Sequence, residues 1–329
     1  MNKNIIIIGI IVFCLCCCIS SGIIYFMTNK KTTTQSTQPD TQPDTQPTTQ
    51  PVTQPTIQPI LIINSLSKNT KDFFINTSGA PSLSAGAYGL KLLNSNYSGP
   101  VLELRRNGDN SIVNFYADAN GNLSYTNNGN VTTLTSWLNG AEAYITKWYD
   151  QTGNNNHAFQ STNENQPKLN IESKVITFPQ DTFLNLPDGA HPFNDSEYSY
   201  IFKCSINNQG GGIFGGGTMG NNQVNAFRRA GDGYHHYWYN VDLPAPVGYS
   251  DNSVITTKYS KTTNQRYIYK NGKLVANNES KNRQQTNNNN YIGKTGFGGN
   301  SECMNGSLSY IYILPINISQ DDQLILENT

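Results

Sequence analysis

Short runs of alternating apolar and polar residues constrain the fold of this chain more than any other feature. The runs are rich in β-branched and aromatic side chains and are separated by turn residues, a pattern typical of half-buried strands. The clearest pair is Gln265–Lys270 and Lys273–Ala276, because the intervening Asn271-Gly272 suits a type I′ turn, whose two central residues need positive φ. The sequence therefore predicts an all-β domain. Strands are expected at Val101–Arg105, Ile112–Tyr116, Val175–Phe178, Tyr198–Cys204, Tyr237–Tyr239, Val254–Tyr259 and Leu308–Leu314.

Helical patterns are few and short. We expect helical pieces at Ser84–Leu93, Leu134–Asn139 and Ser319–Asn328, the last capped by the Ser319 side chain. Two glycine runs, Gly210–Gly212 and Gly215–Gly217, lack the strand-to-helix context of a phosphate-binding loop. Each is therefore interpreted as a tight turn.

The amino-terminal part carries a long apolar run. After a tail of residues 1–4, Ile5–Met27 contains no charge and is long enough to cross a bilayer, which needs roughly 20 residues. We expect a transmembrane anchor; the alternative is a cleaved signal peptide that ends near Ser20-Ser21-Gly22. The count of positive charges on the two sides does not decide the orientation, but the large polar domain favours export of the carboxyl-terminal side. The predicted location is a membrane, with the domain on an extracellular, lumenal or virion surface.

Residues 28–59 contain a Thr-Gln-Pro repeat. Proline at every fourth position removes amide donors and biases the preceding residue towards extended geometry. We expect a semi-rigid stalk, which at roughly 3.1 Å per residue would span on the order of 80 Å. No second linker follows, so residues 60–329 are predicted to form one β-sandwich domain.

The charge balance excludes one class of partner. The net charge is zero and only 13% of residues are charged, so we expect no nucleic-acid binding. Four of the six cysteines lie in the apolar run, which leaves Cys204 and Cys303 either to form one disulfide or to be buried as small hydrophobic residues. Without paired Cys or His motifs we expect neither a metal site nor a cofactor.

Acceptor motifs for N-glycosylation, which suit an exported domain, occur at Asn76, Asn96, Asn122, Asn130, Asn194, Asn278, Asn305 and Asn317.

A more specific pattern surrounds a strand that turns abruptly at Asp150. Ala87–Leu93, Tyr97–Arg106 and Phe115–Asp118 precede the run Trp148–Asn154 in the chain. In order and spacing they resemble the amino-terminal half of the arabinofuranosidase B catalytic-domain family. The Asn-Gly hairpin, Tyr291–Gly293 and the strand from residue 306 to 313 resemble concanavalin A-like sandwiches of the laminin-G-like kind. The resemblance implies a two-sheet jelly roll.

The family resemblance also implies a retaining glycosidase, which needs two carboxyl groups roughly 5 Å apart. The family's nucleophile is a Glu on a central strand, where this sequence has Asn225, and its acid is an Asp in a glycine-rich stretch, where this sequence has Gly299 or Asn300. An amide cannot ionise, so the resemblance implies ancestry with the catalytic carboxylates not retained. Asp150 is then a turn residue. Displaced replacements for the lost carboxylates are Asp232, Asp242 and Glu302.

The densest aromatic patch is Ala230–Asn240, and aromatic faces beside amides and carboxylates suit sugar rings. Its alternative role is to fill the core, since alternate residues of a strand face inward. For the same reason the neighbours His235 and His236 are not expected to share a site. The predicted ligand-binding residues are Asn225, Asp232, His235, His236, Trp238 and Asn300, and the weak catalytic candidates are Asp232 and Glu302.

Three functions fit these features. The leading hypothesis is a membrane-anchored sandwich that binds carbohydrate or glycoprotein without hydrolysing it. The first alternative is an arabinofuranosidase-like glycoside hydrolase, and the second is a structural envelope or adhesion protein.

Overall fold

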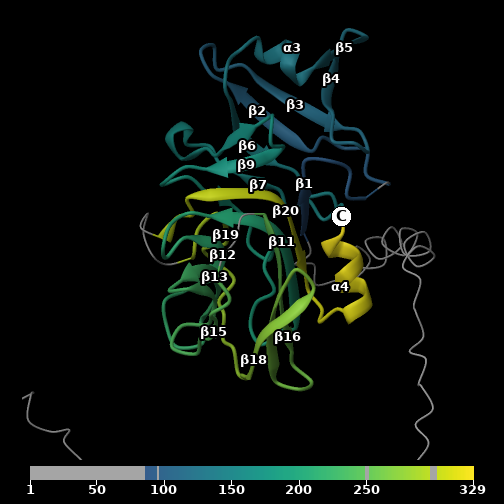
Figure 1. The fold of residues 1–329 in the computed structure, drawn as a ribbon. Coiled ribbons are helices and arrows are strands. Elements are labelled where there is room, and N and C mark those ends of the chain that lie inside the picture. The colour runs from purple at the N-terminus through teal and green to yellow at the C-terminus, as the bar shows by residue number, and fades with distance from the viewer. Residues whose placement is uncertain (1–85, 95, 249–251, 297–301) are drawn as a thin grey trace, which may run out of the picture. The chain divides into compact units, whose positions relative to one another are not determined.

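The computed structural model describes residues 86–329 except 95, 249–251 and 297–301. This part of the chain is nearly all β, and every ladder between its named strands is antiparallel (Figure 1). The predicted tail, anchor and stalk, residues 1–4, 5–27 and 28–59, lie outside the described residues. None of the helices in the described part has the length and apolar character needed to cross a bilayer.

One layer of strands is built around the long central strand β20. On one edge β20 pairs with β1 and β9, and on its other edge the order continues through β11, β16 and β17 to β18. The bounds are β1 (Gly86–Gly89), β9 (Val175–Phe178), β20 (Gly306–Leu314), β11 (Tyr198–Ile206), β16 (Ser253–Ser260), β17 (Gln265–Lys270) and β18 (Lys273–Glu279).

A second run of strands faces this layer and continues beyond it. In order of pairing these strands are β15 (Leu243–Ala245), β14 (Gly233–Tyr237), β13 (Val224–Ala230), β12 (Gly212–Gly217), β19 (Tyr291–Ile292), β10 (Leu184–Asn185), β7 (Ala158–Phe159), β6 (Ala143–Trp148), β2 (Leu102–Arg106), β3 (Ile112–Ala117), β4 (Leu123–Asn127) and β5 (Asn130–Thr133). Strand β8 (Lys168–Asn170) pairs with β6 and β9 and so connects the two runs. The remaining elements are α3 (Leu134–Leu138), the 3-10 turn Asn163–Asn165 and α4 (Gln320–Glu327).

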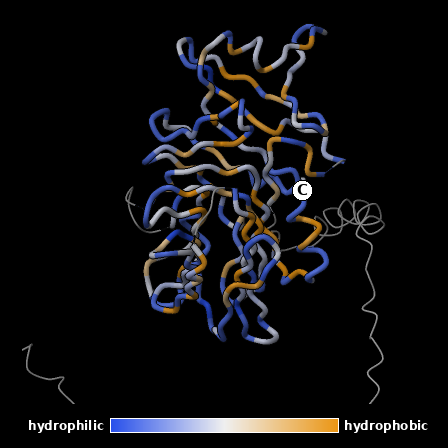
Figure 2. Tube along the Cα trace, in the orientation of Figure 1, coloured by the Kyte–Doolittle hydropathy of each residue, from blue (hydrophilic) through white to orange (hydrophobic). Residues whose placement is uncertain are grey.

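The main core lies between the two layers. The Tyr200 ring of β11 stacks on Phe214 of β12 with centroids 4.0 Å apart, and Phe202 meets Phe227 of β13 edge-on at 5.2 Å. All four side chains are fully buried, and burying each contributes roughly 1.5–3 kcal/mol. The opposite face of β11 and β20 packs on Leu326 of α4 (Figures 1 and 2). The result is a β-sandwich with one helix outside its first layer.

Several sequence predictions are confirmed. The Asn271-Gly272 hairpin joins β17 to β18, and both turn residues have positive φ, 50° and 75°. Short helices occur at Leu134–Leu138 and Gln320–Glu327, and the Ser319 side chain caps α4 by accepting a hydrogen bond from the Asp322 amide. Cys204 and Cys303 are buried and free, so they do not form a disulfide.

The turn at Asp150 redirects the backbone, as predicted. Its carboxylate is fully buried and accepts hydrogen bonds from the amides of Ala87, Thr152 and Asn156 at 3.0, 2.9 and 3.2 Å. Beside it, the Trp148 indole donates to the Gly89 carbonyl at 3.2 Å. This motif therefore fastens the β6–β7 connection to the backbone of β1, which is a structural role.

Three predictions of local structure are wrong. Ser84–Leu93 was expected to be helical, but Gly86–Gly89 forms β1 because its backbone pairs with β20. Tyr237–Tyr239 is not a strand, because β14 ends at Tyr237. Gly215–Gly217 and Gly212 lie in strand β12 and not in tight turns. The glycines are needed there because a Cβ on Gly215 would lie 2.4 Å from the Gly296 amide nitrogen.

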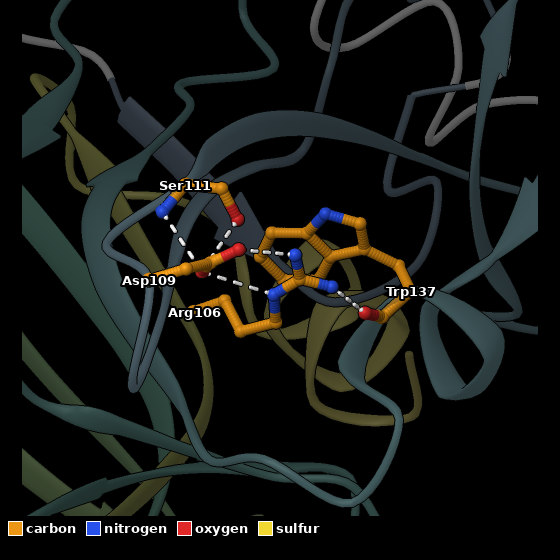
Figure 3. Close-up of polar contacts among 4 residues, drawn as sticks. All are labelled: Arg106, Asp109, Ser111 and Trp137. Atoms are coloured by element: carbon orange, nitrogen blue, oxygen red, sulfur yellow. Dashed lines mark hydrogen bonds and ion pairs between the residues drawn. The ribbon is translucent and has the colours of Figure 1, made fainter.

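An arginine cluster holds the β2–β3 turn against α3 (Figure 3). Arg106 pairs with both carboxylate oxygens of Asp109, donates to the Trp137 carbonyl and lies 5.0 Å from the centroid of the Trp137 ring. Asp109 also accepts from the amide and hydroxyl of Ser111 at 3.1 and 3.0 Å. The hydrogen bond from Arg106 is the largest cause that holds the pKa of Asp109 well below its usual range. We call these four residues the Arg106 cluster.

Candidate functional site

Strands β13 and β14 divide the predicted site residues between two faces. Asn225, His236 and Trp238 point into the core and have no exposed surface. His235 and Arg228, which lie opposite one another in the register, point to the outer face. The sequence-based expectation that the two neighbouring histidines do not share a site agrees with this alternation.

The inward residues Asn225, His236 and Trp238 find hydrogen-bond partners in a buried polar network. The His236 ring contacts the Asn225 and Tyr198 oxygens through Nε2, both at 2.8 Å, and the Thr257 hydroxyl through Nδ1 at 2.6 Å. The Trp238 indole donates to the Tyr198 hydroxyl at 3.0 Å. Burial is the largest cause that lowers the pKa of His236 well below its usual value, and so the ring is neutral at pH 7.

Two buried arginines complete this network. Arg266 lies 4.3 Å from the centroid of the Trp238 ring, and Arg283 lies 5.7 Å from the same ring and 4.8 Å from Tyr198. Their guanidinium groups donate to backbone carbonyls, including those of Val241 and Pro192 at 2.8 Å each. Since its ring is covered, Trp238 offers no platform to a ligand. The structure therefore places Asn225, His236 and Trp238 in the core of the sandwich.

The outer surface of the same strands carries a different group of residues, which we call the β13–β14 face. It consists of Arg228, His235, Tyr237, Tyr239, Asp242 and Glu302. Arg228 lies 4.4 Å from the centroid of the Tyr237 ring and 3.5 Å from a Glu302 oxygen. His235 Nδ1 lies 4.0 Å from an Asp242 oxygen, too far for a hydrogen bond.

Two tyrosines give the β13–β14 face an aromatic platform. Tyr237 and Tyr239 meet edge-on with ring centroids 5.8 Å apart, above Val224 and Ala226. Tyr239 has φ of 63°, in the left-handed region that a bulky residue rarely adopts. Such strain persists where the surroundings enforce it, and it is enriched at binding sites. A partly exposed aromatic ring held this way fits a ligand-contact role.

Charges on the face are incompletely paired. Arg228 Nε, His235 Nδ1 and Asp242 Oδ1 are each shielded from solvent and make no hydrogen bond within the protein. Partial burial raises the pKa of Asp242 and lowers the pKa of His235, and each of these groups partly opposes the shift of the other. Orphaned polar atoms beside the partly exposed Tyr239 ring and the 9% exposed Tyr237 side chain are hydrogen-bonding positions that a polar ligand can satisfy.

The other predicted site residues are placed as follows. Glu302 belongs to the face. Its neighbour Cys303 forms β-bridges with Gly212 and Lys294, and these bridges hold the segment beside β12. The Glu302 carboxylate also accepts a hydrogen bond from the Thr295 hydroxyl. Asp232 is exposed in the turn between β13 and β14. Asn300 lies outside the described residues. The structure thus brings together His235 and Glu302 of the predicted set, with Asp242 as the third.

The predicted ligand-binding residues do not include Tyr237 and Tyr239, although both lie in the aromatic patch, and they do not include Arg228, which lies outside it. The partner of Arg228 across the ladder is His235, and Tyr237 lies two residues further along the same side. The signal was the short turn at Gly231-Asp232, which makes residues 224–237 a hairpin and fixes that register. A hairpin predicted at this turn would have placed Arg228 opposite His235 of the aromatic patch.

Comparison with solved structures identifies proteins with a similar fold. One similar structure is a GH54 α-L-arabinofuranosidase soaked with a cyclic sulfate inhibitor, with a TM-score of 0.57 at 13% identity. Another is an arabinofuranosidase complexed with arabinofuranosyl-α-1,2-xylobiose, with a TM-score of 0.55 at 14% identity. Each match covers 79% of this chain and 64% of the other, so this chain matches less than two thirds of those proteins.

No protein-family model matches this sequence, and a search of curated proteins finds no relative. The structural matches therefore show the fold alone: this chain has an arabinofuranosidase-like β-sandwich fold.

Proposed function

We propose that this protein binds carbohydrate on the β13–β14 face. The observation that carries the proposal is the Tyr237–Tyr239 platform with Arg228, Asp242 and His235 around it, each holding an unpartnered polar atom. Sugar rings present apolar C–H faces to aromatic rings and hydroxyl groups to polar side chains. The similarity of fold to an arabinofuranosidase in complex with an arabinofuranosyl xylobiose supports a pentose-containing glycan as the first ligand to test.

The test is calorimetric titration of the purified full chain with arabinofuranosyl-α-1,2-xylobiose. Tyr237→Ala is expected to weaken binding about tenfold, because it removes the aromatic contact. The control is Tyr267→Ala, which removes a partly exposed tyrosine from β17 in the other layer. A parent chain that binds no member of a glycan array, or an equal loss in both variants, would count against the proposal and favour a structural or adhesion role.

A second function, hydrolysis of a glycosidic bond, is favoured by one observation. Burial raises the pKa of Tyr237, and Asp242 and Glu302 add to this shift, so two carboxyl groups lie near one aromatic ring. In this function Asp242, whose pKa burial raises, serves as the acid, and Glu302 beside Arg228 serves as the carboxylate.

Release of 4-nitrophenol from 4-nitrophenyl α-L-arabinofuranoside tests the hydrolase directly. Activity must disappear in Asp242→Asn and in Glu302→Gln and must persist in Asp232→Asn, which alters an exposed turn carboxylate. If the parent chain binds glycan and releases no 4-nitrophenol, binding without hydrolysis stands as its function.

We also propose that residues 5–27 anchor the protein in a membrane and that residues 28–59 hold the sandwich away from a cell or virion surface. The apolar run and the proline repeat support this arrangement. The sandwich is proposed to have the concanavalin A-like jelly-roll topology. Alkaline carbonate extraction of the expressed full chain tests the anchor: the protein should stay with the membrane pellet, and a soluble product beginning near residue 22 would establish the cleaved signal peptide instead.

A further inference from the structure

A cavity far along the chain from the β13–β14 face carries an inference beyond glycan binding. It has a volume of about 360 Å³ and lies between α3 with its neighbouring strands and the β8–β9 turn. Its size falls in the range of small-molecule sites. Its apolar lining comes from Leu90, Leu123, Leu134, Leu169 and Ile171. Because this lining dominates, the cavity favours the apolar part of a ligand.

A second cavity of about 170 Å³ adjoins the first. The two share Leu90, Gly121 and Lys174 in their linings. Gly121 has φ of 77°, and a Cβ there would lie 3.3 Å from Lys91 Cβ, so the β3–β4 turn passes close to Lys91. The second cavity is also lined by Lys91 and Lys203. Three lysines, Lys91, Lys174 and Lys203, therefore line the second cavity, and Thr329 lines it as well.

Lys174 is the lysine common to both cavities. Its ammonium donates one hydrogen bond, to the Asn120 carbonyl at 3.3 Å, and two further protons remain for other acceptors. Its φ of 51° lies in the left-handed region, where glycine or asparagine is favoured. Asn120 also lines the second cavity, so this hydrogen bond holds the Lys174 ammonium beside that cavity, and the charge of Lys174 also interacts with Asp118.

We propose that the paired cavities bind a small anionic amphiphile, an alkyl chain that ends in a carboxylate. The chain occupies the larger, leucine-lined cavity, and the carboxylate lies at the junction, where Lys174 donates to it and Lys91 and Lys203 add positive potential. Apolar burial supplies the affinity, and the lysines fix the orientation.

The test is calorimetric titration of the purified full chain with decanoate below its micelle concentration. The parent is expected to bind one decanoate per chain. Lys174→Gln is expected to raise the Kd about tenfold, because a hydrogen bond to a charged group is lost. Leu123→Trp, which fills the larger cavity, is expected to abolish this one-per-chain binding, whereas any weaker uptake by other parts of the chain should persist in every variant.

The controls separate charge from general apolar affinity. Lys273→Gln, on exposed β18, and Val131→Trp, on an exposed position of β5, should bind decanoate like the parent. Decanol should bind about tenfold more weakly than decanoate. The proposal is overturned if decyltrimethylammonium binds as tightly as decanoate, if Leu123→Trp binds normally while unfolding at the parent temperature, or if the parent binds no decanoate.

Discussion

Two clusters of this domain use the same three kinds of side chain to different ends. In each, an arginine lies over an aromatic ring and faces a carboxylate: Arg106 with Trp137 and Asp109, and Arg228 with Tyr237 and Glu302. Arg106 contacts both carboxylate oxygens three residues away and also a carbonyl, so its donors are used within the protein (Figure 3). Arg228 makes one contact of 3.5 Å and retains an unpartnered Nε.

This difference in hydrogen-bond partners distinguishes a structural cluster from a candidate binding site. Composition is alike in the two clusters, and both lie on hairpins. What distinguishes them is whether the polar atoms find partners inside the protein, since an orphaned and shielded polar group costs free energy unless something else satisfies it. We therefore assign ligand contact to the β13–β14 face and a fastening role to the Arg106 cluster.

Removing each arginine gives the largest predicted contrast. Arg228→Leu should weaken arabinofuranosyl-xylobiose binding roughly 10- to 100-fold, because hydrogen bonds to charged groups contribute about 1.5–3 kcal/mol. Arg106→Leu should leave the affinity unchanged and lower the Tm, because it releases the β2–β3 turn from α3. Calorimetry and thermal unfolding of both variants measure the two effects. An equal loss of affinity in the two variants would remove the distinction.

A substitution at Tyr239 separates binding from stability. Tyr239→Asn should weaken glycan binding about tenfold through loss of the ring. It should not lower the Tm, because asparagine adopts the left-handed backbone at 63° more readily than tyrosine. Tyr239→Phe keeps the ring and should bind like the parent. If Tyr239→Asn unfolds well below the parent and still binds glycan, the tyrosine serves the fold and not the ligand.

The smallest predicted effect is the loss of thermal stability at acidic pH that results from protonation of Asp109. Its folded-state pKa is lowered by Arg106 and Ser111, so its stabilisation is present above the unfolded pKa near 4 and is lost as the pH falls below that value. Asp109→Asn should therefore unfold at a lower temperature than the parent at pH 7, and the gap should close towards pH 2. A gap that stays constant from pH 7 to pH 2 would show that the carboxylate charge is not involved.

Sequence periodicity predicted much of the sandwich. The alternation in Tyr198–Cys204 and Val254–Tyr259 and the Asn271-Gly272 turn specify local structure directly, and the structure contains β11, β16 and the β17–β18 hairpin there. Strand β12 escaped prediction because its glycines are required by the close approach of residues 295–296 from elsewhere in the chain. A local pattern does not contain that contact.

The candidate site was predictable only in part for a related reason. The aromatic and ionisable residues between 230 and 242 were evident, but which of them face outward depends on the register of β13 with β14. That register places His235 outside and His236 inside, where the Arg266 and Arg283 side chains cover Trp238. The buried arginines come from distant segments, so the sequence near Trp238 does not reveal that its ring is covered.

Hydrogen–deuterium exchange of the full chain, with and without arabinofuranosyl-α-1,2-xylobiose, measures whether the β13–β14 face contacts the ligand. We expect ligand-dependent protection in residues 224–242, which contain Arg228, Tyr237 and Tyr239, and no change in residues 106–111 or 134–138 of the Arg106 cluster. Protection confined to the Arg106 cluster, or unchanged exchange across residues 224–242 at saturating ligand, would contradict ligand contact at this face.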